Sequence, residues 1–186
     1  NKPWTEDDPT GPLGVYGRTK LEGENAVRAA APDNHLILRT AWVYSPFGHN
    51  FVKTMLRLAE NRDQISVVND QFGSPTSALD IAVAIKRVLE VWSGKAQAAN
   101  RTGLGSTFHL AGSGETNWSD FARKIFEESR VHGGPFAEVK GIPTSEYPTK
   151  AIRPENSRLD CSRFNRVFGW QAPDWRLSVA DTVGQL

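Results

Sequence analysis

The chain has 186 residues, of which 39% are hydrophobic, and its 22 basic and 21 acidic side chains leave a net charge of +1. This balance argues against nucleic acid and anionic membranes as partners. No apolar stretch approaches the ~20 residues that a membrane-spanning helix needs. A single cysteine, Cys161, excludes an internal disulfide and favours a reducing, cytoplasmic setting.

Helical and extended segments alternate along the first half of the chain. Residues 13–31 are rich in Ala, Glu, Lys and Arg and stop before a proline, which predicts a helix. Residues 35–44 have a mostly apolar centre and predict one strand of a parallel sheet covered on both sides. A helix over 51–59, a short strand over 65–68 and a turn-rich loop over 69–76 follow.

The second half continues the alternation. Thr76 or Ser77 can cap a helix that runs to about residue 92, with a buried side expected at Ile81, Ile85, Val88 and Leu89. A polar connector is expected over 94–105. The remaining predicted elements are a strand at 107–111, a helix at 116–126, a strand near 137–139, a short helix at 162–168 and a last helix from Leu177. This alternation predicts an α/β layer fold.

Tyr16 and Lys20 form a Tyr-x-x-x-Lys pair inside the first predicted helix. Four residues apart on a helix, two side chains share one face. An ammonium beside a phenol favours the ionised phenolate, which suits the phenol to proton transfer. Lys20 could also hydrogen-bond a ribose hydroxyl of a nicotinamide cofactor. A solvent-facing helix pair has the same spacing, so the pattern alone is a weak signal.

The segment that leads into this pair contains a sequence that imitates a cofactor-binding loop. Residues 10–17 have the spelling Thr-Gly-x-x-Gly-x-x-Gly, which dinucleotide-binding loops use. Such a loop must follow a buried strand, whereas residues 1–8 are polar and predict a surface loop. We therefore interpret residues 10–17 as the turn that starts the helix, and we expect the main cofactor cradle to lie upstream of this sequence.

Five blocks occur in a fixed order: YGRTKLEGE (16–24), LRTAWVY (38–44), NFVKTM (50–55), NDQFGSPT (69–76) and RPENSRLD (153–160). Together they resemble the later part of the dTDP-4-dehydrorhamnose reductase family, within the extended short-chain dehydrogenases and reductases. The resemblance implies a partial Rossmann-like parallel sheet with helices, plus a small C-terminal α/β substrate-binding lobe. Residues 1–93 would hold the end of the Rossmann-like domain and chain entering the lobe. Residues 94–186 would form most of the lobe, and the two parts would interleave.

The resemblance also implies a reaction. NADPH or NADH would deliver hydride to the C4 carbonyl of dTDP-4-dehydro-6-deoxy-L-mannose, and Tyr16 would protonate the developing alkoxide to give dTDP-L-rhamnose. The implied catalytic residues are Tyr16 and Lys20. The implied cofactor-binding residues are Tyr16, Lys20, Thr40 and Ala41, and the implied substrate-binding residues are Trp42, Asn50, Lys53 and Arg153.

The chemistry of the implied substrate-binding residues leaves alternatives open. An indole such as Trp42 offers an apolar face and one N–H to a deoxysugar, but it could instead be a core residue. Lys53, at a helix start, and Arg153 suit an anionic nucleotide, although both could be ordinary surface cations. Neither the four histidines nor Cys161 show metal-ligand spacing, so no metal site is expected.

The family's Gly-rich loop and its catalytic Ser or Thr would lie upstream of this sequence. We therefore expect the fragment alone to be inactive and to bind no cofactor, with one sheet edge uncovered. A non-catalytic binding module, such as the regulatory subunit of methionine adenosyltransferase, stays open as an alternative. A nucleotide-sugar epimerase or dehydratase also uses the Tyr and Lys, although block 69–76 resembles those enzymes poorly. The sequence leaves a homodimer open.

Overall fold

The computed structural model describes residues 2–93, 102–147, 149 and 153–186. Most of the expected connector over 94–105 therefore lies outside the described residues. The α/β fold class is confirmed, because helices alternate with short and mostly parallel strands. The helices are α1 (Val15–Ala30), α2 (Phe51–Ala59), α3 (Ala78–Ser93), α4 (Trp118–Val131), α5 (Ser162–Phe168) and α6 (Trp175–Val183), with a 3-10 turn, η1, at Thr144–Glu146.

The strands pair in four small sheets within the described part of the chain. They are β1 (Leu36–Arg39), β2 (Val43–Tyr44), β3 (Gln64–Val68), β4 (Phe72–Gly73), β5 (Thr76–Ser77), β6 (Ser106–His109), β7 (Thr116–Asn117) and β8 (Glu138–Ile142). β1 pairs with β6, β2 with β5 and β3 with β8, all in parallel, whereas β4 pairs with β7 antiparallel. The β1–β6, β3–β8 and β4–β7 pairings join the two halves of the chain, whereas β2 and β5 both belong to the first half.

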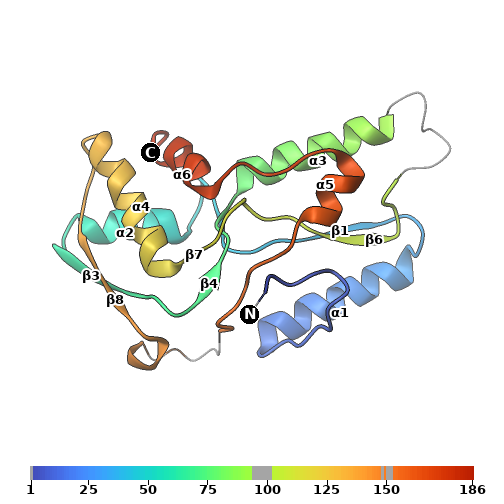
Figure 1. The fold of residues 1–186 in the computed structure, drawn as a ribbon, viewed down its shortest axis with the longest axis horizontal. Coiled ribbons are helices and arrows are strands. Elements are labelled where there is room, and N and C mark those ends of the chain that lie inside the picture. The colour runs from blue at the N-terminus through green and yellow to red at the C-terminus, as the bar shows by residue number, and fades with distance from the viewer. Residues whose placement is uncertain (1, 94–101, 148, 150–152) are drawn as a thin grey trace.

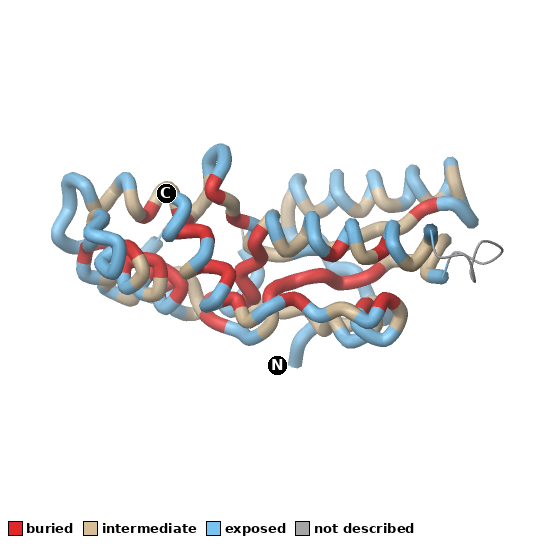
Figure 2. Tube along the Cα trace, turned by 90° about the horizontal axis from the view of Figure 1, so that it is seen from above, coloured by how far each residue is buried: buried red, intermediate tan, exposed pale blue. Residues whose placement is uncertain are grey.

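The elements gather into two lobes with β4 and β7 between them (Figure 1). The first lobe contains α1, β1, β6, α3 and α5, and the second contains α2, β3, β8, α4 and α6. Each lobe has its own apolar core, and buried chain runs through the interior of both (Figure 2). The first core contains Ala84, Val88, Phe108, Leu110, Phe164 and Phe168. The second is centred on aromatic and aliphatic residues of α4, α2, α6 and β3, among them Phe121, Ile125, Val52, Val179 and Ile65.

The strand predicted over 35–44 is wrong as a single element. β1 ends at Arg39, β2 begins at Val43, and Trp42 between them has a φ of 49°, in the left-handed region. A large non-glycine residue rarely adopts this conformation, so the surrounding structure must impose it. The imposed break lets the chain leave its pairing with β6 and enter a new pairing with β5.

The buried side predicted for the third helix is wrong at two positions. Ile85 and Leu89 are 45% and 55% exposed, whereas Ala84 and Val88 are buried against the first core. Apolar residues occur on most sides of α3, so periodicity alone did not distinguish the side that faces β1 and β6. Smaller differences concern boundaries: the predicted loop 69–76 contains the short strand β4 and the first residue of β5, and the last helix begins at Trp175.

Candidate functional site

The Tyr-Lys pair lies in the first turns of α1. Residues 9–13 have no regular secondary structure, and Gly14 precedes the helix in an extended conformation. The Lys20 Nζ lies 5.3 Å from the centroid of the Tyr16 ring, so the two side chains share one face, as the spacing predicts. Tyr16 is 77% exposed. The pair is therefore assembled by the helix and open to a ligand.

An ion pair joins α1 to the strand beside it. The Arg39 guanidinium, at the end of β1, donates from Nε to Glu24 Oε1 at 2.8 Å and from Nη2 to Glu24 Oε2 at 2.7 Å. Hydrogen bonds from Arg39 hold the pKa of the Glu24 carboxyl below its usual range, and Glu24 in turn raises the pKa of Arg39. Both groups are therefore charged near neutral pH. Neither residue is among the catalytic, cofactor-binding or substrate-binding residues that the resemblance implies.

Thr40 and Ala41 directly follow the carboxyl end of β1. Thr40 is exposed and Ala41 is half-buried. In open α/β sheets, ligands bind outside the carboxyl ends of the parallel strands. The two residues therefore lie where a ligand of such a sheet is expected, one step along the chain from Arg39.

Trp42 is held in an aromatic stack. Its ring lies parallel to that of Trp118, with 3.7 Å between centroids and 13° between planes. A Cβ built on Gly73 would lie 2.5 Å from Cε2 of Trp42 and 2.8 Å from both Cζ2 and Nε1, which places Gly73 over the ring. Trp118 and the Gly73 backbone therefore both restrict the access of a ligand to the indole.

Asn50 and Lys53 both shape the turn that precedes α2. Asn50 caps the helix, since its Oδ1 accepts from the Lys53 backbone N–H at 3.3 Å, and its Nδ2 donates to the Ser45 carbonyl at 2.7 Å. The Lys53 Nζ donates to the Pro46 carbonyl at 3.1 Å. An Asn directly before an apolar helical run is itself a capping signal, so the sequence could have predicted this structural role.

Arg153 is exposed and begins the described segment 153–186. This segment lies beside β4: the Phe72 N–H donates to the Glu155 carbonyl, and the Ser157 N–H donates to the Phe72 carbonyl, both at 2.7 Å. Arg153 is therefore near the seam between the lobes. Within the described residues, no hydrogen bond, ion pair or ring contact joins Arg153 to Tyr16, Lys20 or Trp42.

The block 69–76 serves the fold at this seam. The Asp70 carboxylate accepts from the Thr144 N–H at 2.9 Å and from its hydroxyl at 2.5 Å, and these bonds lower the pKa of Asp70. Ser74 Oγ donates to the Gly114 carbonyl at 2.8 Å. These bonds explain the polar residues of the block, which helix or strand periodicity does not explain.

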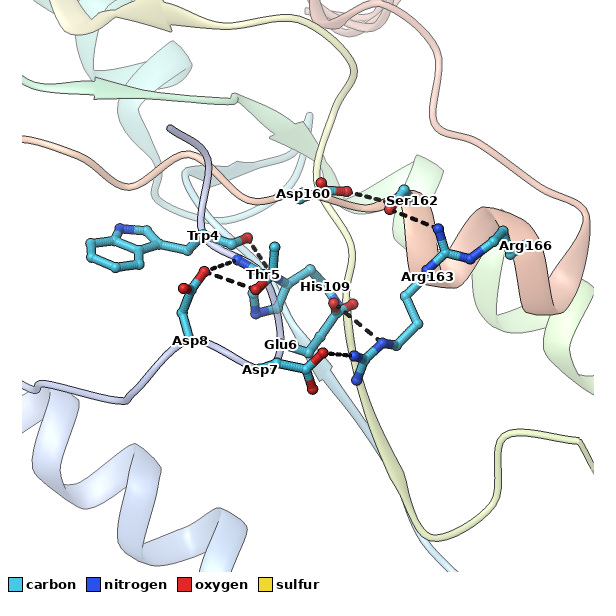
Figure 3. A network of polar contacts seen from close by, with 10 residues as sticks. All are labelled: Trp4, Thr5, Glu6, Asp7, Asp8, His109, Asp160, Ser162, Arg163 and Arg166. Carbon is cyan, nitrogen blue, oxygen red and sulfur yellow. Dashed lines mark hydrogen bonds and ion pairs between the residues drawn. The ribbon is translucent and has the colours of Figure 1, made fainter. Parts of the chain in front are cut away.

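Residues 2–8 form a loop at the surface, as predicted, but Trp4 to Asp8 are docked against the second half of the chain (Figure 3). Trp4 donates to the Arg158 carbonyl at 2.9 Å, and its own carbonyl accepts from the Asp160 N–H at 2.8 Å. The Glu6 side chain is only 4% exposed and accepts from the His109 N–H at 2.8 Å. Burial lowers the pKa of His109, which favours its neutral form. Because these contacts join residues that are far apart in the sequence, no local sequence pattern predicts them.

Surface pockets occur away from these residues. One surface pocket of about 400 Å³ lies between β7 and the start of α6 and is lined by Phe72, Asn117, Arg123, Trp175 and Arg176 among others. It contains none of the sequence-predicted site residues. Among the described residues, no cluster of His, Cys, Asp and Glu is arranged to hold a metal ion. None of the described helices is long and apolar enough to cross a membrane.

An α/β fold with a Tyr-x-x-x-Lys pair on a helix beside a parallel strand is typical of short-chain dehydrogenases and reductases. The whole chain, residues 1–186, matches the family described as RmlD substrate binding domain, and it belongs to that family. It is 48% identical over 184 residues to the dTDP-4-dehydrorhamnose reductase of Sinorhizobium fredii, which covers 99% of the chain and 60% of the relative. The resemblance of the five sequence blocks is confirmed.

Solved structures show the same similarity. A dTDP-4-dehydrorhamnose reductase from Clostridium acetobutylicum superposes with a TM-score of 0.85 at 35% identity, covering 99% of this chain and 60% of that one. A Bacillus anthracis dTDP-4-dehydrorhamnose reductase in complex with NADP gives 0.84 at 32% identity with the same coverage. The chain therefore spans about 60% of the length of the relatives it matches.

Proposed function

We propose that this chain is the later part of an NAD(P)H-dependent reductase that converts dTDP-4-dehydro-6-deoxy-L-mannose to dTDP-L-rhamnose. The observation that carries the proposal is the Tyr16-Lys20 pair, exposed on one face of α1, in a chain 48% identical to a dTDP-4-dehydrorhamnose reductase. The NADP held by the Bacillus anthracis relative supports a nicotinamide cofactor, and the choice between NADPH and NADH stays open.

The chain's residues have distinct roles in this proposal. A reduced nicotinamide, when bound, supplies the hydride that adds to the C4 carbonyl carbon. Tyr16 donates its phenolic proton to the carbonyl oxygen as that hydride arrives, so the C=O bond becomes a secondary alcohol. Lys20 stabilises the phenolate left behind and hydrogen-bonds a ribose hydroxyl of the cofactor. Thr40 and Ala41 line the nicotinamide end of the site, because they follow the carboxyl end of β1.

Substrate recognition is assigned to a second set of residues: Trp42, Asn50, Lys53 and Arg153. The Trp42 indole carries an N–H for which the structure shows no hydrogen-bond partner among the described residues, and this N–H can donate to a sugar oxygen. Lys53 and Arg153 supply positive charge for the two phosphates, and Asn50 holds the turn that presents Lys53. We also propose that residues 1–93 end the Rossmann-like domain, that residues 94–186 form most of the substrate lobe, and that the enzyme can form a homodimer.

The chain alone is expected to be inactive and to bind no cofactor. Among the described residues β1 pairs only with β6, so its other edge is open, and α1 buries none of its residues. These uncovered surfaces support a further part of the protein that completes the sheet and contacts the cofactor. Titration calorimetry of the 186-residue chain with NADPH tests this expectation, and binding in the micromolar range would contradict it.

The reaction itself is tested in the complete protein. It is incubated with NADPH and dTDP-4-dehydro-6-deoxy-L-mannose, oxidation of the cofactor is followed by absorbance, and the sugar product is identified by NMR. We expect dTDP-L-rhamnose and one equivalent of oxidised cofactor. Cofactor oxidation with a different sugar configuration, or no oxidation by a folded protein, would exclude the proposed function.

A further inference from the structure

The orientation of α1 depends on polar contacts. None of its 16 residues is buried. Glu24 receives the two-point contact from Arg39 of β1, and it also accepts from Arg28 Nη2 at 2.8 Å. The same Arg28 atom donates to Thr107 Oγ1 of β6 at 3.0 Å. Ionic and hydrogen-bonded links therefore fasten this helix to the first lobe, where other helices use apolar side chains.

The contact between Glu24 and Arg39 is built to fix an angle as well as a distance. The two side chains are only 16% and 22% exposed, so solvent competes weakly for their hydrogen bonds. A planar guanidinium that meets both oxygens of a carboxylate restricts the rotation of one group relative to the other. A single-point contact from a lysine would not do so.

The pair also has a particular place along the helix. Tyr16, Lys20 and Glu24 follow each other at intervals of four residues, and each interval advances about 6 Å along the axis and about 40° around it. They therefore form one stripe on α1. At the other end of the contact, Arg39 is the last residue of β1 and is followed directly by Thr40 and Ala41. One ion pair thus connects the stripe that carries the proton donor with the strand end that carries the cofactor candidates.

We propose that Glu24 and Arg39 are positioning residues: their two-point contact sets the rotation of α1 relative to the end of β1 and so aims Tyr16 and Lys20 at the reacting carbonyl. The inference rests on the proposed function. Neither residue touches the substrate, and both act through the helix and the strand that they join. Misplacement of a catalytic group by about 1 Å can cost about 100-fold in rate, so a small rotation of α1 has a large effect.

The test uses the complete protein with Glu24→Gln, Arg39→Lys and a matched control. The control is Lys124→Met, which removes an ion pair of similar burial on α4: Lys124 Nζ lies 2.6 Å from Glu128, and the side chains are 20% and 15% exposed. We expect Glu24→Gln to lower kcat about 10- to 100-fold with KM for the nucleotide sugar within about threefold. Arg39→Lys keeps the charge without the fork and should lie in between. Lys124→Met should leave kcat unchanged.

Two results would overturn the inference. One is a kcat for Glu24→Gln within about twofold of the unmodified protein. The other is an equal loss of kcat in Lys124→Met, which would mean that activity follows stability alone.

A second measurement separates this inference from the proposed function. Hydrogen exchange of the same proteins should show faster exchange of the α1 amides in Glu24→Gln and unchanged exchange of the α4 amides. Unchanged exchange in α1 would overturn the positioning role whatever the substrate. If α1 exchanges faster in Glu24→Gln but the unmodified enzyme does not reduce the dTDP-sugar, the proposed function is rejected. The link between α1 and β1 would still stand in that case.

Discussion

Helices α1 and α4 are similar in length, with 16 and 14 residues, but they are held in opposite ways. α4 buries six side chains in the second core: Ser119, Phe121, Ala122, Ile125, Phe126 and Ser129. α1 buries none and is attached to the first lobe by the contacts of Glu24 and Arg28. The helix that carries the candidate proton donor is thus the one whose orientation is most easily changed by a local substitution or by a ligand.

The largest expected effect is on catalysis and comes from α1. Tyr16→Phe in the complete protein removes the phenolic proton and should lower kcat by about 10²- to 10⁴-fold. The fold should persist because Tyr16 is 77% exposed. Consumption of reduced nicotinamide measures kcat, and circular dichroism checks the fold. Tyr147→Phe, at a position that is 51% exposed, is the control and should keep full activity. Equal activity of both variants would remove Tyr16 from the mechanism.

The largest expected effect on stability comes from α4. Phe121 is fully buried and contacts the rings of Tyr44, Phe51 and Trp175. Phe121→Ala should therefore lower the free energy of unfolding by about 3–5 kcal/mol. Val27→Ala on α1, where the side chain is 44% exposed, should change it by no more than about 0.5 kcal/mol. Urea unfolding of the 186-residue chain measures both, and similar losses would show that the two helices are held alike.

The seam between the lobes should show an intermediate effect. Gly73→Ala would place a methyl group 2.5 Å from Cε2 of Trp42, so the indole would have to shift and its stacking on Trp118 would change. Such overpacking costs about 1–3 kcal/mol. Urea unfolding measures the loss, and near-ultraviolet circular dichroism reports the change in the stacked indoles. An unchanged spectrum with unchanged stability would mean that the stack adjusts freely and that Gly73 does not fix Trp42.

Acid should loosen α1 before α4. The pKa of Glu24 is lowered in the folded chain, so its stabilising contribution is complete above its unfolded value, near 4.5, and is lost as pH falls through the lower folded value. The apolar contacts of α4 do not titrate. Hydrogen exchange between pH 7 and about 3, corrected for intrinsic rates, should show protection falling first in α1. Glu24→Gln should remove this pH-dependent loss of protection in α1, and simultaneous loss in both helices of the unmodified chain would contradict the prediction.

Local periodicity predicted the parts of the site that belong to one element. The four-residue spacing placed Tyr16 and Lys20 on one face, because a helix needs only its own sequence to define its faces. It could not predict the break at Trp42, which follows from pairing with two different strands. Nor could it predict the burial of Glu6, whose partner His109 is 103 residues away. Long-range pairing decides these features, and the local sequence does not encode it.

The smallest expected effect bears on what covers α1. A Cβ added at Gly23, inside this helix, meets no atom within 4 Å. Gly23→Ala should therefore stabilise the 186-residue chain by about 0.5–1 kcal/mol, because alanine loses less backbone entropy than glycine in a helix. Urea unfolding measures this gain. If the rest of the protein packs against this side of α1, the same substitution in the complete protein should cost stability instead. Equal gains in both proteins would place the additional contacts on another side of the helix. The other side would then be the one that carries the stripe of Tyr16, Lys20 and Glu24, where the cofactor and Arg39 make their contacts.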